Sequence, residues 1–280
     1  GRLTTVKEGR HAGLKLEGPE YETIYAFGGL CAIDRIEEIV YLNDLCDRLG
    51  MDTITAGNLC GLAIEACRRG KLTGDLAYGR VDAIANLLQK IAHREGIGEI
   101  LAQGIRAAAA EWDLEDVAVH VKGLEPAGYD PRLLKGVGLG YATSDRGACH
   151  LRATFYKPEL SGMIDPAITA GKAALFIDFE DRLTLFDTLI LCRFYRDLYP
   201  WESLGELLTH ITGIKWDTSD LKTVSSRICN MVRRFNIREG LTPYDDRLPE
   251  RFYKNTLKGG CRITESELQR MLTDYYRLRG

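Results

Sequence analysis

The sequence lacks any pair of cysteines at the C-x-x-C spacing that self-contained zinc and iron–sulfur sites use. Its eight cysteines are scattered through 280 residues. A chain of this length has enough apolar residues for a core, so a disulfide framework is not expected. Reduced thiols, most of them buried as small apolar side chains, are the expected state.

Further absences exclude whole classes of protein. No apolar run approaches the roughly 20 residues that a membrane-spanning helix needs, and no basic-then-apolar leader opens the chain. A net charge of −3 leaves no electrostatic footprint for nucleic acid or an anionic membrane. We therefore expect a cytoplasmic protein without nucleic-acid or membrane partners.

Helical periodicity, by contrast, runs through almost the whole chain. It predicts helices over residues 33–49, 55–70, 81–96 and 97–112, and later over 168–179, 183–198, 201–211, 221–240 and 265–278. Asp34 with Glu37 resembles a capping box, Thr55 is expected to cap the second helix, and Gly50 is expected to end the first.

The stretch from 117 to 151 has a different composition. It is rich in glycine, including Gly136, Gly138 and Gly140, and is predicted to be mostly loop. Short strands are weakly indicated at 3–6 and 117–121. The predicted fold class is all-α and multihelical, with two packed helical domains, 1–120 and 121–280, and the glycine-rich loop region between them.

Two segments far apart in the sequence share one pattern. Asp47–Asp52 and Asp187–Cys192 each place an acid at the end of an apolar stretch, then a turn position and a second potential ligand. A carboxylate can accept both parallel N–H donors of an amino-pyrimidine edge, and Gly50 lets the first segment turn sharply. The alternatives are a surface acid at Asp47, a helix-capping acid at Asp52 and a core cysteine at Cys192.

Two further regions hold candidate proton carriers. His150 ends a polar cluster that also contains Asp145, Arg146 and Arg152, and it is either a proton carrier or a histidine hydrogen-bonded inside its loop. Glu22, close to Glu20, is either a buried carboxylate that relays protons or an ordinary acid at a helix start.

In their order along the chain, these segments resemble the two helical carboxyl-terminal domains of the tungsten-containing aldehyde:ferredoxin oxidoreductases. The resemblance covers essentially the whole chain. Its segments are Gly18–Thr23, Asn43–Ile54, Tyr129–Arg132, Tyr141–Arg152, Asp187–Cys192, Phe235–Gly240 and Asp245–Phe252.

The resemblance implies a role for each position. Asp47 and Asp52 would meet one pterin, and Asp187 with Leu191 the other. Cys192 would be the last ligand of a 4Fe-4S cluster. Glu22 and His150 would lie near the metal, tungsten or molybdenum. The implied reaction oxidises a small aldehyde to a carboxylic acid and passes electrons through the cluster to ferredoxin.

The sequence departs from the family pattern in three ways. The family's C-x-x-C-x-x-x-C run and its β-rich, pterin-binding amino-terminal domain are absent, Met51 replaces a leucine, and Ile190 replaces a glycine. We therefore expect a fragment that is cofactor-free and inactive by itself. The alternative is a non-catalytic helical binding or scaffold module that retains the fold. The particular aldehyde and pairing into a homodimer are left open.

Overall fold

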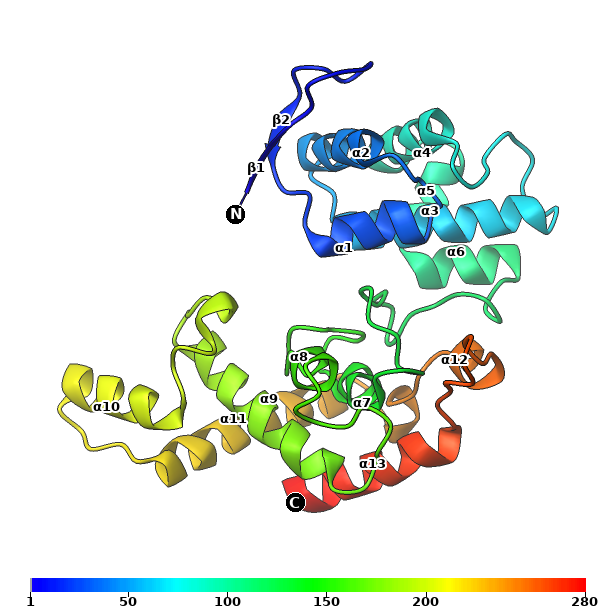
Figure 1. Cartoon of the computed structure of the whole chain (residues 1–280). Helices are drawn as coiled ribbons and strands as arrows, with labels where there is room; N and C mark the ends of the chain where they lie inside the picture. The colour runs from blue at the N-terminus through cyan, green and yellow to red at the C-terminus, as the bar shows by residue number, and fades with distance from the viewer. Residues whose placement is uncertain (1) are drawn as a thin grey trace. The chain divides into compact units, whose positions relative to one another are not determined.

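Helices dominate the structure, a computed structural model that describes residues 2–280 (Figure 1). The only sheet among these residues is a two-stranded hairpin, so the predicted all-α, multihelical class is confirmed. Packing divides the chain into unit 1, Gly1–Gly128 with Pro249–Arg251, and unit 2, Tyr129–Leu248 with Phe252–Gly280. The limits of 1–120 and 121–280 stay a prediction, because packing units need not coincide with a family's domains.

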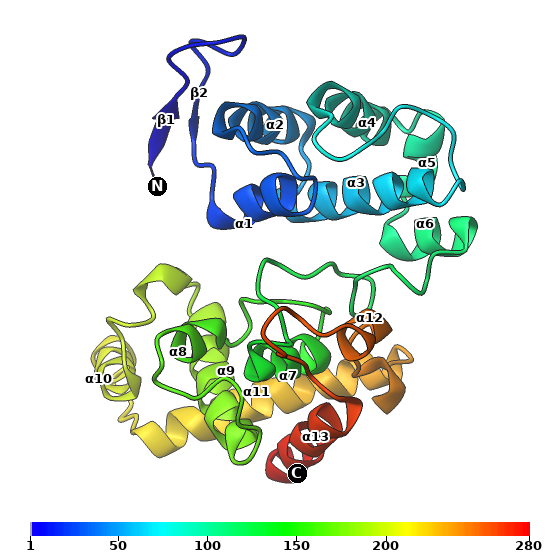
Figure 2. The same cartoon turned by 45° about the vertical axis from the view of Figure 1, so that its right-hand side comes forward.

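Unit 1 consists of an antiparallel hairpin followed by helices. Its elements are β1 (Leu3–Thr5), β2 (Lys15–Glu17), α1 (Tyr21–Thr23), the π-helical turn η1 (Ile24–Gly29), α2 (Ile36–Leu49), α3 (Thr53–Arg68), α4 (Val81–His93), α5 (Ile97–Leu101) and α6 (Ile105–Trp112). In both Figure 1 and Figure 2, α2 and α4 lie along one side of α3, and α6 lies along the other.

The centre of unit 1 is α3, and its small residues let η1 approach closely. A Cβ added to Gly57 would lie 2.6 Å from Ala26 of η1. Such a contact excludes any larger side chain at this position. The close approach holds α1, which precedes η1, near the start of α3.

The ends of α2 agree with the prediction at one end and differ at the other. The helix stops at Gly50, which has a left-handed φ of 69° as a C-terminal glycine should. The predicted capping box of Asp34 and Glu37 is wrong. Arg35 occupies the N-cap without a side-chain cap bond, and Glu37 instead accepts a hydrogen bond from the Arg35 Nε at 2.9 Å.

Two other predictions for unit 1 need correction. The helix predicted over 97–112 is divided into α5 and α6 by Gly104, whose φ of 95° is incompatible with a continuous helix. No strand forms over 117–121 among the described residues. Only an isolated bridge joins Val121 to Leu124. The hairpin strand β1, in contrast, lies within the predicted 3–6.

Unit 2 is built around α9, α11 and α13. Its elements are α7 (Lys135–Thr143), α8 (Tyr156–Leu160), α9 (Lys172–Thr188), the 3-10 turn η2 (Arg193–Tyr195), α10 (Trp201–Thr212), α11 (Thr218–Arg238), the 3-10 turn η3 (Pro243–Asp245), α12 (Glu250–Lys254, divided between the units) and α13 (Glu265–Arg279). One apolar cluster joins α9, α10 and α11 through Phe186, Leu204 and Leu221.

Part of the glycine-rich stretch is a helix, α7, where loop was predicted. The glycines let aromatic rings pack against its backbone: a Cβ on Gly136 would lie 2.3 Å from Phe155, and one on Gly140 would lie 3.0 Å from Phe176. Buried Glu159 accepts hydrogen bonds from the N–H groups of Gly136 (2.9 Å) and Val137 (3.2 Å). A carboxylate at a helix N-terminus stabilises that end, so tertiary contacts override a composition that favours loop.

The two helices predicted over 168–179 and 183–198 are one helix and a turn. Helix α9 runs without a break to Thr188, and the chain then turns into η2. The helix ends there because the Leu191 N–H bonds back to the Phe186 carbonyl at 2.9 Å.

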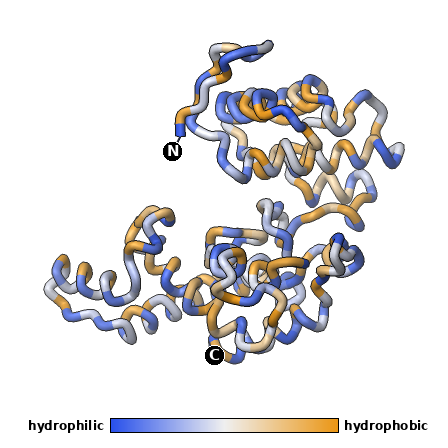
Figure 3. Tube along the Cα trace, viewed as in Figure 1, coloured by the Kyte–Doolittle hydropathy of each residue, from blue (hydrophilic) through white to orange (hydrophobic). Residues whose placement is uncertain are grey.

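Hydrophobic and hydrophilic residues alternate along the helices in Figure 3, the pattern of helices with one buried face. Within residues 2–280, no helix has the length and apolar character needed to cross a membrane.

Candidate cofactor-binding turns

The first candidate site is the turn after α2, residues 47–52, here called the first turn. The Gly50 N–H donates to the Asp47 carbonyl at 3.2 Å, and the Met51 N–H donates to the Cys46 carbonyl at 2.9 Å. This back-bonding is a Schellman-type helix end. Met51 packs against the core of unit 1 and anchors the turn, while Asp47 is exposed at the helix end.

The turn after α9, residues 187–192, here called the second turn, has the same construction. The Ile190 N–H donates to the Asp187 carbonyl at 3.1 Å, and the Leu191 N–H donates to the Phe186 carbonyl at 2.9 Å. Ile190 has a left-handed φ of 57°, close to the 69° of Gly50 at the matching position. Leu191 packs against the apolar cluster of unit 2.

The last residues of the two turns also match. Asp52 has φ −67° and ψ 127°, and Cys192 has φ −66° and ψ 127°. Each is exposed and each starts the next helical segment. The carboxylate of Asp52 and the thiol of Cys192 therefore project from equivalent backbone positions.

The acids of the first turn have local partners and remain exposed. Asn43 Nδ2 donates to Asp47 Oδ2 at 2.8 Å, four residues along α2. The Thr55 N–H donates to Asp52 Oδ2 at 2.8 Å, so Asp52 is the N-cap of α3, and the predicted cap at Thr55 is wrong. Because both carboxylates are exposed, capping still leaves oxygen edges for a ligand.

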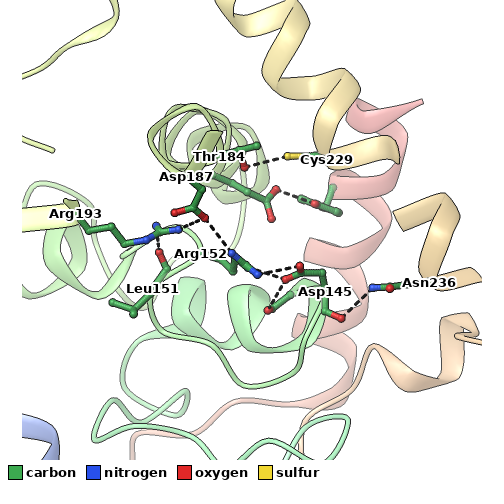
Figure 4. A network of polar contacts seen from close by, with 11 residues as sticks. Asp145, Leu151, Arg152, Thr184, Asp187, Arg193, Cys229 and Asn236 are labelled. Atoms are coloured by element: carbon green, nitrogen blue, oxygen red, sulfur yellow. Dashed lines mark hydrogen bonds and ion pairs between the residues drawn. The ribbon is translucent and has the colours of Figure 1, made fainter. Parts of the chain in front are cut away.

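Asp187 of the second turn is held by two arginines (Figure 4). Arg152 Nη1 donates to Asp187 Oδ2 at 3.0 Å, and Arg193 Nη2 donates to the same oxygen. Arg152 also donates two hydrogen bonds to the Asp145 carboxylate, of 2.7 and 3.0 Å. The pairing neutralises Asp187 in part and leaves its Oδ1 for another donor.

The two arginines differ electrostatically. Burial is the largest single effect and opposes the charge of Arg152, but the hydrogen bond that Arg152 donates to Asp145 and the nearby negative charges together outweigh it, so the pKa of Arg152 is raised. Burial lowers the pKa of Arg193, and the charge of Asp187 opposes that shift. Both guanidinium groups stay cationic at neutral pH. Sequence reasoning missed Arg193, although a basic residue directly after Cys192 was its available signal.

A cavity of about 760 Å³ lies within unit 2 beside the second turn. Asp145, Arg152 and Asp187 line it together with residues of α9, α11 and α13, including Val232 and Tyr275. The volume falls in the range of small-molecule sites, roughly 300–1,000 Å³. The second turn therefore borders space that can accommodate part of a bound molecule.

Glu22 and Glu20 have different surroundings in the structure. Glu22 is half-buried, and its Oε2 accepts a hydrogen bond from the Gly128 N–H at 3.3 Å. Tyr21 next to it donates its hydroxyl to the Gly128 carbonyl at 2.8 Å. Glu20 is exposed at the start of α1 and makes no side-chain cap bond. Of the two acids, Glu22 is the one held in place.

His150 is half-buried next to an aromatic pair in unit 2. Its ring centroid lies 5.8 Å from Tyr129 and 6.2 Å from Tyr156, and those two tyrosines stack at 4.0 Å. His150 is two residues from Arg152, so its loop is tied to the second turn through the ion pair with Asp187.

Glu125 is a buried acid near the first turn that sequence reasoning missed. Thr55 Oγ1 donates to Glu125 Oε2 at 3.0 Å. Burial raises the pKa of Glu125, hydrogen bonds from its own N–H and from Thr55 oppose this, and the charge of Asp52 raises it further. The signal in the sequence was a lone acid between Leu124 and Pro126.

The structure thus brings Asp47 and Asp52 together in one turn, and Asp187, Leu191 and Cys192 together in another. Glu22 belongs to unit 1 and His150 to unit 2. Within residues 2–280, no three His, Cys, Asp or Glu side chains are arranged to hold a metal ion. A cluster at Cys192 would therefore need ligands from outside this set, and the predicted roles stay predictions.

Comparison with protein families identifies the class. The profile described as "Aldehyde ferredoxin oxidoreductase, domains 2 & 3" matches residues 1–280, so the chain belongs to the aldehyde ferredoxin oxidoreductase family. The resemblance inferred from the ordered motifs is confirmed.

Individual relatives carry the comparison further. The tungsten-containing aldehyde ferredoxin oxidoreductase of Pyrococcus furiosus is 35% identical over all of this chain and 47% of its own length. That of Thermococcus kodakarensis is 35% identical over 94% of this chain and 46% of its own length. The aliphatic sulfonate oxidoreductase, WOR-like subunit, of Pyrococcus furiosus is 28% identical over 98% and 45%. The chain spans a little under half the length of these relatives.

Among solved structures, the chain is similar to the BamBC active-site complex of benzoyl coenzyme A reductase with 1,5-dienoyl-CoA. The TM-score is 0.73 over 95% of this chain and 47% of that chain, at 20% identity. At that identity the likeness establishes the fold alone.

Proposed function

We propose that this chain forms the two helical domains of a metal–pterin oxidoreductase that oxidises an aldehyde to a carboxylic acid. The family membership supports an oxidoreductase. Because the chain spans under half of its relatives, the activity belongs to a longer polypeptide that also supplies a pterin-binding domain and the remaining cluster ligands.

The observation that carries the proposal is that the two turns have the same backbone conformation and each begin with an exposed acid. Each presents an exposed carboxylate at the end of a helix, Asp47 or Asp187, on a backbone held by the same two hydrogen bonds. A carboxylate at a helix C-terminus is mildly unfavourable unless a donor compensates it. The amino-pyrimidine edge of a pterin offers two parallel N–H donors that suit a carboxylate. Two equivalent carboxylates suit a pair of pterins.

The residues fit their proposed partners to different degrees. Asp52 adds a second exposed carboxylate to the first turn, and Leu191 fixes the backbone of the second. Cys192 offers an exposed thiol, as a cluster ligand must. Residues 2–280 contain no group of three His, Cys, Asp or Glu side chains that could hold a metal ion.

The reaction converts RCHO and H₂O to RCOOH, two protons and two electrons. The bound metal–pterin group and cluster would accept the electrons and pass them to ferredoxin. In this chain, Asp47 and Asp187 orient the pterins, and Glu22 and His150 take up protons. Both are half-buried, and a carboxylate oxygen and a ring nitrogen are groups that can accept a proton.

The test uses the natural polypeptide that carries this chain, purified from anaerobic cells supplied with tungstate. We expect bound metal, pterin and iron, and reduction of a viologen dye that depends on aldehyde. Asp47→Ala and Asp187→Ala should each lower pterin content and activity at least tenfold, the scale on which ligand-holding residues act.

Asp178→Ala is the matched control, because Asp178 lies on the same helix as Asp187, is also paired with a cation, and has a similarly exposed side chain, 42% against 41%. Wild-type protein without metal and iron would refute the proposal. So would full pterin content in both turn variants.

A further inference from the structure

Glu125 is a buried carboxyl group that the proposed function leaves unused. The residue is 4% exposed, and no lysine or arginine of residues 2–280 forms an ion pair with it. An unpaired carboxylate in such a place is costly, and protonation removes that cost. Burial therefore raises the pKa of Glu125 above its usual value, and the hydrogen bonds from its own N–H and from Thr55 oppose that rise.

Thr55 connects this buried acid to the exposed first turn. Its backbone N–H donates to Asp52 Oδ2 at 2.8 Å, and its hydroxyl donates to Glu125 Oε2 at 3.0 Å. One residue thus contacts both carboxyl groups, and Asp52 is the charged group that acts on Glu125 from α3. A change of charge at Asp52 must change the proton affinity of Glu125.

The same segment reaches the other acid of the proposed site. Gly128, three positions after Glu125 in the chain, donates its N–H to Glu22 Oε2 at 3.3 Å. Glu22 is the acid that faces this segment from α1. Residues 125–128 therefore contact both a predicted proton carrier and the start of α3.

We propose that Glu125 stores a proton for the first turn: it is protonated while Asp52 is free, and it releases that proton to solvent when ligand N–H groups bind Asp52. The ionised carboxylate can then accept one of the two protons that aldehyde oxidation yields. Because Glu125 is 4% exposed and its side chain is linked to the first turn by Thr55, it acts through Asp52. This inference rests on the proposed function for its catalytic meaning, but not for the coupling itself.

The coupling is testable in the 280-residue chain without cofactors. In a carbon-13 NMR titration of labelled glutamate, one carboxyl should titrate above the usual value of 4.5 and vanish in Glu125→Gln. Glu111→Gln, at an exposed position on α6, should leave that signal unchanged.

Two variants at the start of α3 test the connection. Asp52→Asn removes the charge but keeps a capping oxygen, and it should lower the proton affinity of Glu125 roughly two- to tenfold, up to about one pKa unit. Thr55→Val removes a donor to the ionised form and should raise the pKa of Glu125. Titration of Glu125 with the bulk glutamates, or no response to Asp52→Asn, would overturn the proposal.

In the natural polypeptide, Glu125→Gln should alter the pH–rate profile while metal and pterin contents stay at the wild-type level. An unchanged profile would refute the catalytic role. Failure of the proposed function would look different: wild-type protein would lack metal and activity, yet the titration of the chain would still decide whether Glu125 and Asp52 are coupled.

Discussion

The first and second turns follow the same backbone path, but a different residue occupies the left-handed position of each, here called the pivot. Gly50 occupies the left-handed position in one, and Ile190 occupies it in the other. Left-handed geometry is easily adopted by glycine and disfavoured for a β-branched residue. The second turn keeps it because the hydrogen bond to Phe186 and the packing of Leu191 determine the path, while the Ile190 side chain is 93% exposed. Tertiary anchoring thus outweighs the preference of a single residue.

The largest difference between the turns is expected at their last residue, Cys192 or Asp52, in iron content and activity. In the natural polypeptide, Cys192→Ser should abolish cluster iron and reduce activity to background, because a hydroxyl is a poor replacement for a cluster thiolate. Asp52→Asn at the equivalent position should leave the iron in place. Iron analysis and viologen reduction measure both, with Cys261→Ser as the cysteine control. Full iron content in Cys192→Ser would break the proposed division of roles.

The second largest effect is expected on the free energy of unfolding, when the pivot residue is replaced by valine. Gly50→Val places a β-branched residue at φ 69° and should lower the free energy of unfolding by about 1–2 kcal/mol. Ile190→Val retains the same strain in the second turn and should change little. Urea denaturation followed by tryptophan fluorescence reads out unit 1 through Trp112 and unit 2 through Trp201. Equal destabilisation by both variants would contradict the comparison.

Relief of the strained pivot should have a smaller effect of opposite sign. Ile190→Gly removes an isoleucine from a left-handed position. It loses almost no buried apolar surface, because that side chain is in solvent. Part of the gain is offset by the extra freedom of glycine in the unfolded chain, so we expect about 0.5–1 kcal/mol of added stability. Ile190→Asn, which also tolerates this conformation, should give a similar sign. A loss of stability in both variants would show that the isoleucine makes a contact of its own.

The smallest effects are expected when the acids at the two helix ends are neutralised, and the two changes in stability should have opposite signs. Asp187→Asn removes a partner of Arg152 and Arg193 and should cost up to about 1 kcal/mol at low salt, less when salt screens the exposed pair. Asp47→Asn removes a negative charge from a helix C-terminus and should be neutral or stabilise by a few tenths of a kcal/mol. Denaturation at two salt concentrations tests both. The same sign and salt response in both variants would contradict the expected difference between Asp187 and Asp47.

Much of this molecule was predictable from local patterns. Periodic apolar residues indicated α2, α4, α10, α11 and α13. Helix α13 starts at Glu265 as predicted, and the Thr264 side chain caps it by accepting a hydrogen bond from the Glu267 N–H. The turns were predictable because acid, turn position and ligand recur at the same spacing. In the structure, both turns have a left-handed residue at this position, even where it is an isoleucine.

Other features depended on contacts between distant residues. The helix α7 forms in a glycine-rich stretch because Glu159, far along the chain, caps it and Phe155 packs where side chains are missing. Arg152 reaches Asp187, 35 positions along the chain, only because folding brings the two segments together.

The sequence by itself determined the helical class, the two equivalent turns and the family, because these are encoded in residues close together along the chain. The tertiary structure alone decided which acids are exposed, paired or buried. Asp187 is paired with arginines, Asp52 caps a helix, and Glu125 is buried beside Thr55, since burial and charge partners come from segments that only folding brings into contact.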